Sequence, residues 1–242
     1  MKLLANIAVN SKHASRSLGA GESFYVRTGK RWLDATVSST GLILLSPVIL
    51  IAAMAVKLTT SGPAFYRQFR VGRFGRPFRI VKFRSMVEGA DRRGPPVTAH
   101  GDCRITRLGR WMRKMKIDEI PQLFNVLAGD MSLVGPRPEA PVFAATYTPS
   151  QRRVFLQRPG ITGTAANAYV REEEILAGHS EAAKFYVAEV LPKKLELDLL
   201  YCDDIRLATD VKLILETFSK LIEKSAKPES SLLQTPGSPA SS

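Results

Sequence analysis

The chain has 242 residues, enough for one domain of moderate size plus an accessory segment, and its 45% hydrophobic content is sufficient for a folded core. Lysine and arginine (35) outnumber aspartate and glutamate (22), and the resulting net charge of +13 favours anionic partners: nucleic acid, anionic lipid headgroups or phosphorylated small molecules. Cys103 and Cys202 stand far apart with no CxxC or metal-like spacing, which argues against a disulfide framework.

Residues 1–29 are polar and basic, and we interpret them as a flexible lead-in. From Ala35 to Val56 the chain then runs 22 residues without a charge. A helix of that length reaches about 30 Å, the thickness of the hydrocarbon core of a membrane. A buried core helix of a soluble protein is the simplest alternative.

Two features favour a re-entrant membrane helix over residues 30–58 rather than a single span, although a span stays open. Pro47 lies in the middle and bends a helix because it removes a backbone hydrogen bond, and the hydroxyl of Ser46 beside it can satisfy freed backbone groups. Basic residues flank both ends of the segment: Lys30 and Arg31 precede it, and Lys57 is the first basic residue after it. Because basic flanks favour the cytoplasmic side, a helix that enters and leaves by one face satisfies both ends.

The remaining pattern predicts a helix-rich α+β fold with one compact domain over residues 59–224. AFYRQFRVG and PFRIVKFRSM alternate apolar and basic residues around VGRFGRP, which predicts a β-hairpin. Residues 105–115 form a basic amphipathic pattern, typical of a helix on a membrane surface or against an ordinary core. Further helices are expected at 118–128, closed by Gly129, and at 149–157, 181–203 and 207–224. Residues 225–242 have a disordered composition.

The adjacent carboxylates Asp118 and Glu119 are the main candidates for chemistry. Their simplest interpretation is a helix N-cap and a solvated first turn. A helix N-terminus also favours phosphate, however, and the preceding run RWMRKMK supplies cations for an anionic substrate. One carboxylate can attack phosphorus as a nucleophile, and its neighbour can bind Mg²⁺ together with phosphate oxygens.

Phosphoryl transfer also needs cations around the phosphates. Arg137 and Pro138 in GPRP and Arg158 in RPGITG stand among stiff or close-approach residues, and Lys82 and Arg84 lie on a predicted strand. Each cation could equally be a solvated surface charge. The run 171–174, Arg-Glu-Glu-Glu, is interpreted as an exposed helix start without a metal. The sequence contains no P-loop, no Gly-x-Gly-x-x-Gly fingerprint and no metal-spaced His/Cys cluster.

From about Lys30 to Ile222 the chain resembles the bacterial sugar transferase family, the monotopic phosphoglycosyl transferases. The resemblance rests on five motifs in order: SPVILI, GPAFYRQFRVG, FRIVKFRSM, KIDEIPQLFNVLAGDMSLVGPRP and RPGITG. It implies a membrane helix broken at Ser46-Pro47, and a catalytic domain (59–224) on the cytoplasmic face of the bacterial inner membrane, in contact with its anionic lipids.

The resemblance also implies a two-step reaction. Asp118 would attack the β-phosphate of a UDP-sugar and release UMP, and undecaprenyl phosphate would then take the phosphosugar. Glu119 would hold Mg²⁺, and Arg113 and Arg137 would contact phosphate. Such enzymes begin the assembly of surface polysaccharides or glycoconjugates. The oligomeric state is left open, a homo-oligomer included.

One stretch departs from the commonest family pattern. Many members continue RPGITG with a Trp-Ala-Gln-Val-Asn-Gly-Arg run, whereas this chain reads TAANAYVREEEILAG, similar to a subgroup with a tyrosine, an arginine and an acidic cluster. The sugar therefore stays open.

Two other classes of protein compete with the enzyme. In a membrane-tethered nucleic-acid-binding protein the aromatic and basic hairpin would stack bases, but the carboxylate pair and the two rigid turns would have no role. The other competing class is a non-catalytic scaffold, which is disfavoured because the acid pair and Arg137 are retained. The prediction is therefore an enzyme without a nucleic-acid partner.

Overall fold

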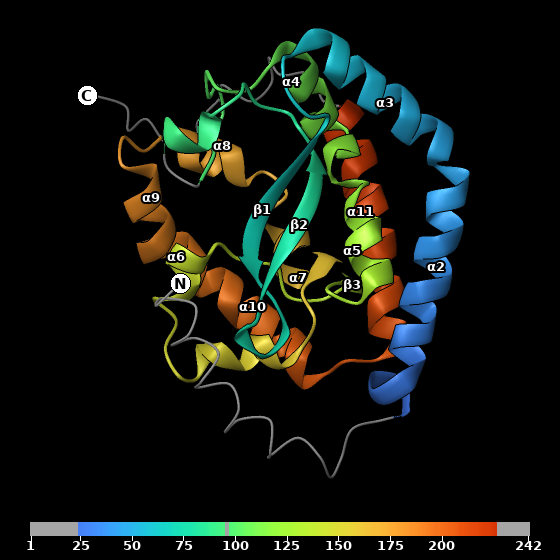
Figure 1. Ribbon diagram of the computed structural model, residues 1–242. Coiled ribbons are helices and arrows are strands. Elements are labelled where there is room, and N and C mark those ends of the chain that lie inside the picture. The colour runs from blue at the N-terminus through green and yellow to red at the C-terminus, as the bar shows by residue number, and fades with distance from the viewer. Residues whose placement is uncertain (1–23, 95–96, 227–242) are drawn as a thin grey trace, which may run out of the picture.

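The computed structural model describes residues 24–94 and 97–226, which form a helix-rich α+β body with two small two-stranded sheets. The long hairpin of β1 and β2 lies at the centre of Figure 1, with helices on both sides. The predicted fold class is confirmed at this level. Most of the predicted lead-in (1–29) and tail (225–242) lies outside the described residues, but residues 24–29 and 225–226 are helical, against the prediction.

A bent helix pair runs along one edge of the molecule (Figure 1). A π-helical turn, Tyr25–Gly29, continues into α2 (Lys30–Leu44), and α3 (Ser46–Thr59) follows at an angle of 63°. Pro47 occupies the first turn of α3, where its missing N–H is tolerated, and the Ser46 hydroxyl donates to the carbonyl of Ile43 at 2.8 Å. The bend predicted at Ser46-Pro47 is confirmed. The helical segment predicted to begin at residue 30 begins five residues earlier, at Tyr25.

In the described part of the chain, no single helix has the length and apolar content to cross a membrane, but this bent pair meets both requirements together. Its large apolar side chains are mostly exposed, including Trp32, Ile43, Leu44, Leu50, Ile51, Met54 and Leu58. The alternative of a buried core helix does not fit this exposure.

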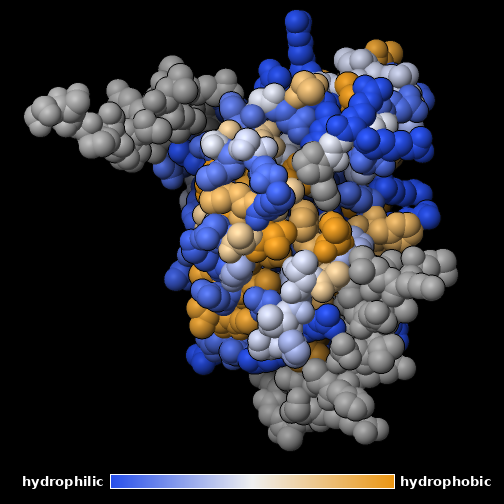
Figure 2. Space-filling view, turned by 90° about the vertical axis from the view of Figure 1, so that its left-hand side faces the viewer, coloured by the Kyte–Doolittle hydropathy of each residue, from blue (hydrophilic) through white to orange (hydrophobic). Residues whose placement is uncertain are grey.

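Figure 2 views a different face of the molecule, on the side of α9 (Ala182–Phe185). Hydrophilic residues surround hydrophobic ones in the centre of that face.

Polar contacts attach α2 to the body. Asp34 is buried, and its Oδ1 accepts from the Leu133 amide at 2.9 Å and the Ser132 hydroxyl at 3.1 Å. Lys30 and Tyr25 both donate to Asp210 of α11 (Leu207–Ala226), with the tyrosine hydroxyl at 2.6 Å. A buried carboxylate requires such partners, so these contacts fix the position of the bent helix.

The predicted hairpin is confirmed as β1 (Phe65–Val71) and β2 (Pro77–Phe83), antiparallel from Phe65↔Phe83 to Val71↔Pro77. The rings of Phe65 and Phe83 stack at 5.2 Å, and Phe83 forms a small core with Val56 of α3 and Met112. Burying a side chain as large as Phe83 stabilises the fold by roughly 1.5–3 kcal/mol. These rings therefore attach α3 to the hairpin, a packing role distinct from the stacking platform that a nucleic-acid-binding protein would present.

The remaining helices are short. They are α4 (Arg107–Lys114), α5 (Gln122–Ala128), α6 (Pro141–Ala144), α7 (Thr164–Ala168), α8 (Glu172–Ala177), α9 (Ala182–Phe185) and α10 (Leu191–Asp203). The helix predicted at 149–157 is a 3₁₀ helix, Gln151–Leu156, and the one predicted at 181–203 is divided into α9, a π turn (Tyr186–Val190) and α10. Helix α11 extends two residues into the predicted tail. Two larger apolar clusters complete the core, one centred on Phe143, Phe155, Leu176 and Tyr186, the other on Phe78, Val126, Met131 and Tyr201.

The motifs GPRP and RPGITG meet at the second sheet. Strand β3 (Ser132–Val134) pairs in parallel with β4 (Gly160–Thr162), and a Cβ on Gly160 would lie 2.1 Å from the Gly135 nitrogen. Gly163 likewise faces the Gly135 carbonyl, at 2.2 Å from an added Cβ. These glycines allow two backbone segments to pack closely, whereas the sequence analysis predicted that they allow a ligand to approach.

Candidate functional site

A cavity of about 870 Å³ lies beside the hairpin, with walls from β2, α4, the turn that follows α4, and the segment that contains α8. Its lining is rich in charged side chains: Lys82, Arg84, Arg113, Lys116, Asp118, Glu119, Arg137, Glu139, Arg171, Glu172, Glu173, Glu174 and Lys194. Most site residues predicted from the sequence therefore meet in one cavity.

Asp118 and Glu119 lie in a 3₁₀ turn, Ile117–Glu119, and the predicted helix start at Asp118 is wrong. Helix α5 begins only at Gln122, and before it the Ile120 amide donates to the Ile117 carbonyl at 3.1 Å in a 3₁₀ pattern. Asp118 and Glu119 are 5% and 8% exposed. Cations from other elements, rather than a helix N-terminus, supply the positive charge around them.

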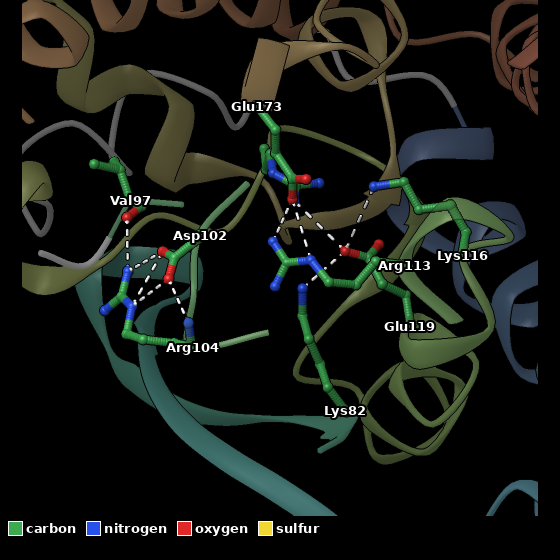
Figure 3. A network of polar contacts seen from close by, with 9 residues as sticks. Lys82, Val97, Asp102, Arg104, Arg113, Lys116, Glu119 and Glu173 are labelled. Atoms are coloured by element: carbon green, nitrogen blue, oxygen red, sulfur yellow. Dashed lines mark hydrogen bonds and ion pairs between the residues drawn. The ribbon is translucent and has the colours of Figure 1, made fainter. Parts of the chain in front are cut away.

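Three cations surround one oxygen of Glu119. Its Oε1 lies 2.8 Å from Lys82 Nζ, 3.5 Å from Arg137 Nη2 and 3.9 Å from Lys116 Nζ. Figure 3 shows Lys82 and Lys116 reaching this carboxylate from two sides. Burial by itself would raise the pKa of Glu119, but Lys116, Lys82 and Arg137 outweigh it and hold this pKa well below its usual range. Glu119 is thus a fixed negative charge.

Asp118 has a different environment. Burial raises the pKa of Asp118, and the neighbouring Glu119 carboxylate raises it further, against the opposing effect of Lys82, Lys116 and Arg113. Its Oδ1 is buried and has no hydrogen-bond partner among the residues that the structure describes. The two adjacent carboxylates therefore have pKa values pushed in opposite directions, an arrangement that separates their chemical roles.

Arg113 of α4 pairs across the cavity with Glu173, as Figure 3 shows. The Glu173 Oε1 accepts from Arg113 Nε at 3.2 Å and also from Nη2. Glu172 pairs with Lys194, which is buried. The helix start predicted at 171–174 is confirmed, since α8 begins at Glu172, but these side chains are half-buried and line the cavity.

Sequence reasoning missed Glu172, Glu173 and Lys194 as cavity residues. Lys116 is the last residue of the run RWMRKMK, from which the sequence predicted cations for the substrate. The pairs Arg113–Glu173 and Glu172–Lys194 join residues far apart in the chain, and no local pattern indicates them.

The other predicted residues divide into two groups. Arg84 and Pro138 line the cavity. Arg158 is not among its lining residues: its Nε donates to the Gly129 carbonyl at 2.9 Å, at the C-terminal end of α5, where Arg31 donates to Val126 and Leu127. The backbones near the two arginines meet, since the Gly160 amide donates to the Pro136 carbonyl at 2.8 Å, but Arg137 contacts Glu119 whereas Arg158 contacts Gly129. The assignment of Arg158 to phosphate is therefore not supported.

The fit of Mg²⁺ to the carboxylate pair follows from its donor atoms. The described residues contain no group of three or more His, Cys, Asp or Glu side chains placed to hold a metal. Mg²⁺ at phosphate sites needs only one or two carboxylates and takes phosphate oxygens and water besides. The ion pairs of Glu119 within the described chain fall on Oε1, and Asp118 Oδ1 is unpartnered there. The residues present therefore fit a magnesium ion that is shared with a phosphate.

With this geometry established, comparison with known proteins identifies the family. Residues 25–224 match the bacterial sugar transferase family, and the chain belongs to it. It is 36% identical over 196 residues to a UDP-N-acetylgalactosamine-undecaprenyl-phosphate N-acetylgalactosaminephosphotransferase of Aeromonas hydrophila, a match that covers 80% of this chain and 43% of that protein.

Two further relatives are named as UDP-glucose:undecaprenyl-phosphate glucose-1-phosphate transferases. The protein of Klebsiella pneumoniae is 39% identical over 202 residues, covering 81% of this chain and 41% of the relative. The protein of Caulobacter vibrioides is 39% identical over 198 residues, covering 80% of this chain and 69% of the relative. The chain thus spans less than half the length of two of these relatives.

Proposed function

We propose that this protein is a phosphoglycosyl transferase that moves a sugar 1-phosphate from a UDP-sugar to undecaprenyl phosphate. The observation that carries the proposal is the carboxylate pair in the cavity: Glu119 held by three cations, beside Asp118 with an unpartnered buried oxygen. The printed names of the relatives, which specify UDP-sugars and undecaprenyl phosphate, supply the substrates. They name different sugars, so the sugar is left to experiment.

In the first step, a carboxylate oxygen of Asp118 attacks the β-phosphorus of the UDP-sugar. A bond forms between that oxygen and phosphorus, the bond from the β-phosphorus to the bridging oxygen breaks, and UMP leaves with the electron pair. Because Oδ1 has no hydrogen bond to break, its lone pairs are available for attack. Burial raises the pKa of Asp118, which makes its carboxylate more basic and a stronger nucleophile.

In the second step, a phosphate oxygen of the acceptor attacks the same phosphorus. The bond to Asp118 breaks, the carboxylate is regenerated, and the product is a diphosphate that joins sugar and lipid. Lys82, Lys116 and Arg137 stand within 4 Å of Glu119 and neutralise charge on the phosphates in both steps. Glu119, with Asp118 beside it, would hold Mg²⁺, which when bound neutralises phosphate charge.

Release of UMP tests the proposal. Purified full-length protein in lipid nanodiscs is incubated with a panel of UDP-sugars, MgCl₂ and undecaprenyl phosphate, and UMP is measured. We expect UMP with at least one sugar, and its loss in Asp118→Asn and Asp118→Ala. A well-folded Asp118→Asn protein with full turnover would exclude this nucleophile. Intact mass after incubation with the UDP-sugar alone should rise by one sugar phosphate in the parent and not in Asp118→Asn.

Location at the cytoplasmic face of the bacterial inner membrane is a further part of the proposal. Its support is the bent, exposed apolar helix pair with basic residues on both flanks. In a protein whose two native cysteines are replaced, single cysteines before residue 30 and after residue 60 should both be labelled only from the cytoplasmic side. Labelling of the two positions from opposite sides would show a spanning helix instead.

A further inference from the structure

The Arg84 side chain is a buried cation whose hydrogen bonds are incomplete. It is 7% exposed, and its Nη2 donates to the carbonyl and hydroxyl oxygens of Thr60, at 3.1 and 2.7 Å. Its Nε and Nη1 are buried and have no hydrogen-bond partner among the described residues. Glu88 is the acidic side chain nearby, but it forms no ion pair with Arg84 in the described chain. A buried charge with unsatisfied donors is strongly unfavourable unless an anion or water completes it.

The position of Arg84 indicates which anion that is. Arg84 follows β2 by one residue and stands two positions after Lys82, so both lie toward the same side of the strand, about 7 Å apart along it. Lys82 contacts Glu119, whereas Arg84 contacts Thr60, the residue at which α3 ends. Arg84 therefore lines the same cavity as the carboxylate pair and contacts the residue at which the bent helix ends.

Apolar side chains also line the cavity that contains Arg84. Pro63, Phe65 and Trp111 line the cavity with it, and Trp111 is 55% exposed. Leu58, in the last turn of α3, is 87% exposed. A ligand with a phosphate at Arg84 and a long hydrocarbon chain would lay that chain along exposed apolar residues. Because Thr60, which Arg84 contacts, is the residue at which α3 ends, a phosphate here can belong to a ligand whose chain lies beside the exposed apolar helix.

We infer that Arg84 binds the phosphate of the polyprenyl phosphate acceptor, next to the donor phosphates held by Lys82, Lys116 and Arg137. This inference rests on the proposed function and adds which substrate the residue serves. Because Nη1 lies against Gly62, at 2.3 Å from the position of an added Cβ, the link between α3 and β1 must shift for the phosphate to enter. Gly62 has φ +97°, a conformation that other residues rarely adopt.

The two half-reactions separate the substrates. UMP released by full-length protein in nanodiscs without acceptor reports the donor step, and turnover at varied undecaprenyl phosphate gives the KM for the acceptor. For Arg84→Met we expect this KM to rise on the order of 10- to 100-fold, as for loss of a charged hydrogen bond, while donor-step UMP release stays within about 2-fold. Arg84→Lys, which keeps the charge, should recover part of the loss.

The controls separate binding from structure. Thr60→Val removes the hydroxyl that Arg84 contacts but leaves the charge, and should raise the acceptor KM by less than about 3-fold. A comparable rise in Thr60→Val and Arg84→Met would show a structural role and overturn the inference. Loss of the donor step in Arg84→Met with an unchanged acceptor KM would assign Arg84 to the nucleotide sugar. An unchanged acceptor KM together with weaker binding to phosphatidylglycerol vesicles would assign it to a membrane lipid headgroup.

Failure of the proposed function is distinguishable, because a parent protein that releases no UMP from any UDP-sugar refutes the function before Arg84 is varied. A parent that turns over, combined with Arg84 variants of normal acceptor KM, refutes this inference alone.

Discussion

Glu173 binds Arg113 across the cavity, and one carboxylate oxygen accepts from two nitrogens of the guanidinium. In the proposed enzyme, Arg113 is expected to contact a substrate phosphate, and the Glu173 carboxylate occupies it in place of that phosphate. In the proposed enzyme, the donor must displace Glu173 from Arg113 in order to bind.

Glu173→Gln should therefore tighten the donor site. The Arg113–Glu173 ion pair is partly exposed, so its competition with the donor phosphate is worth about 0.5–1 kcal/mol. We therefore expect the KM for the UDP-sugar to fall about 2- to 5-fold with little change in kcat. Glu174→Gln is the matched control, because Glu174 pairs with Arg171 at 4.0 Å instead. A rise in KM for Glu173→Gln would show that Glu173 contacts the substrate itself.

Lys82 is the closest cation to Glu119, and its removal should affect both folding and activity. Lys82→Met leaves the buried carboxylate with contacts of 3.5 and 3.9 Å, and we expect a loss of about 1–3 kcal/mol in stability and at least about 100-fold in UMP release. Lys82→Arg should retain more of both. Thermal unfolding in nanodiscs and UMP release measure the two effects, and a Met variant as stable and active as the parent would contradict the assigned role.

The sequence was most informative where local chemistry decides the structure. A Ser-Pro pair inside an uncharged run bends a helix wherever it occurs, and alternation of apolar and basic residues specifies a hairpin, so both elements were predictable. The turn at Asp118 was not, because an Asp followed by Pro121 suits a helix N-terminus as well as a 3₁₀ turn. Arg137 and Arg158 have similar neighbours in the sequence, and only their tertiary contacts, Glu119 for Arg137 and Gly129 for Arg158, distinguish them. Pairs such as Arg113–Glu173 depend on tertiary packing alone.

Asp34 should be essential to the attachment of the bent helix. Asp34→Ala leaves the buried Leu133 amide without its acceptor, and we expect a loss of about 1–3 kcal/mol, visible as a lower thermal midpoint in nanodiscs. Thr36→Val is a control on the same helix, because the Thr36 hydroxyl bonds only to carbonyls of its own helix, Trp32 and Leu33, in the described chain. Equal midpoints for Asp34→Ala and the parent would show that other contacts suffice.

Asp198 gives the stability of the protein a pH dependence that can be measured. It is buried, and it accepts from the amides of Arg137 at 3.1 Å and Ala165 at 3.3 Å, so it positions two loops of the cavity. Burial raises the pKa of Asp198 to about 6 against the opposing effect of these two hydrogen bonds. The folded state therefore keeps the proton where the unfolded chain has lost it, and the stability this proton contributes is full below about pH 4 and disappears as the pH rises through 6.

Asp198→Asn carries no titrating group, so its stability relative to the parent should improve as the pH rises from 4 to 8, by about 3 kcal/mol. At pH 4 the variant should be the less stable of the two, because its amide can accept through only one atom and leaves one backbone N–H unpaired. Thermal midpoints across this pH range measure the difference. Asp130→Asn, at an exposed position, serves as the control variant. A constant offset between Asp198→Asn and the parent would show that Asp198 is ionised throughout and that the buried proton does not exist.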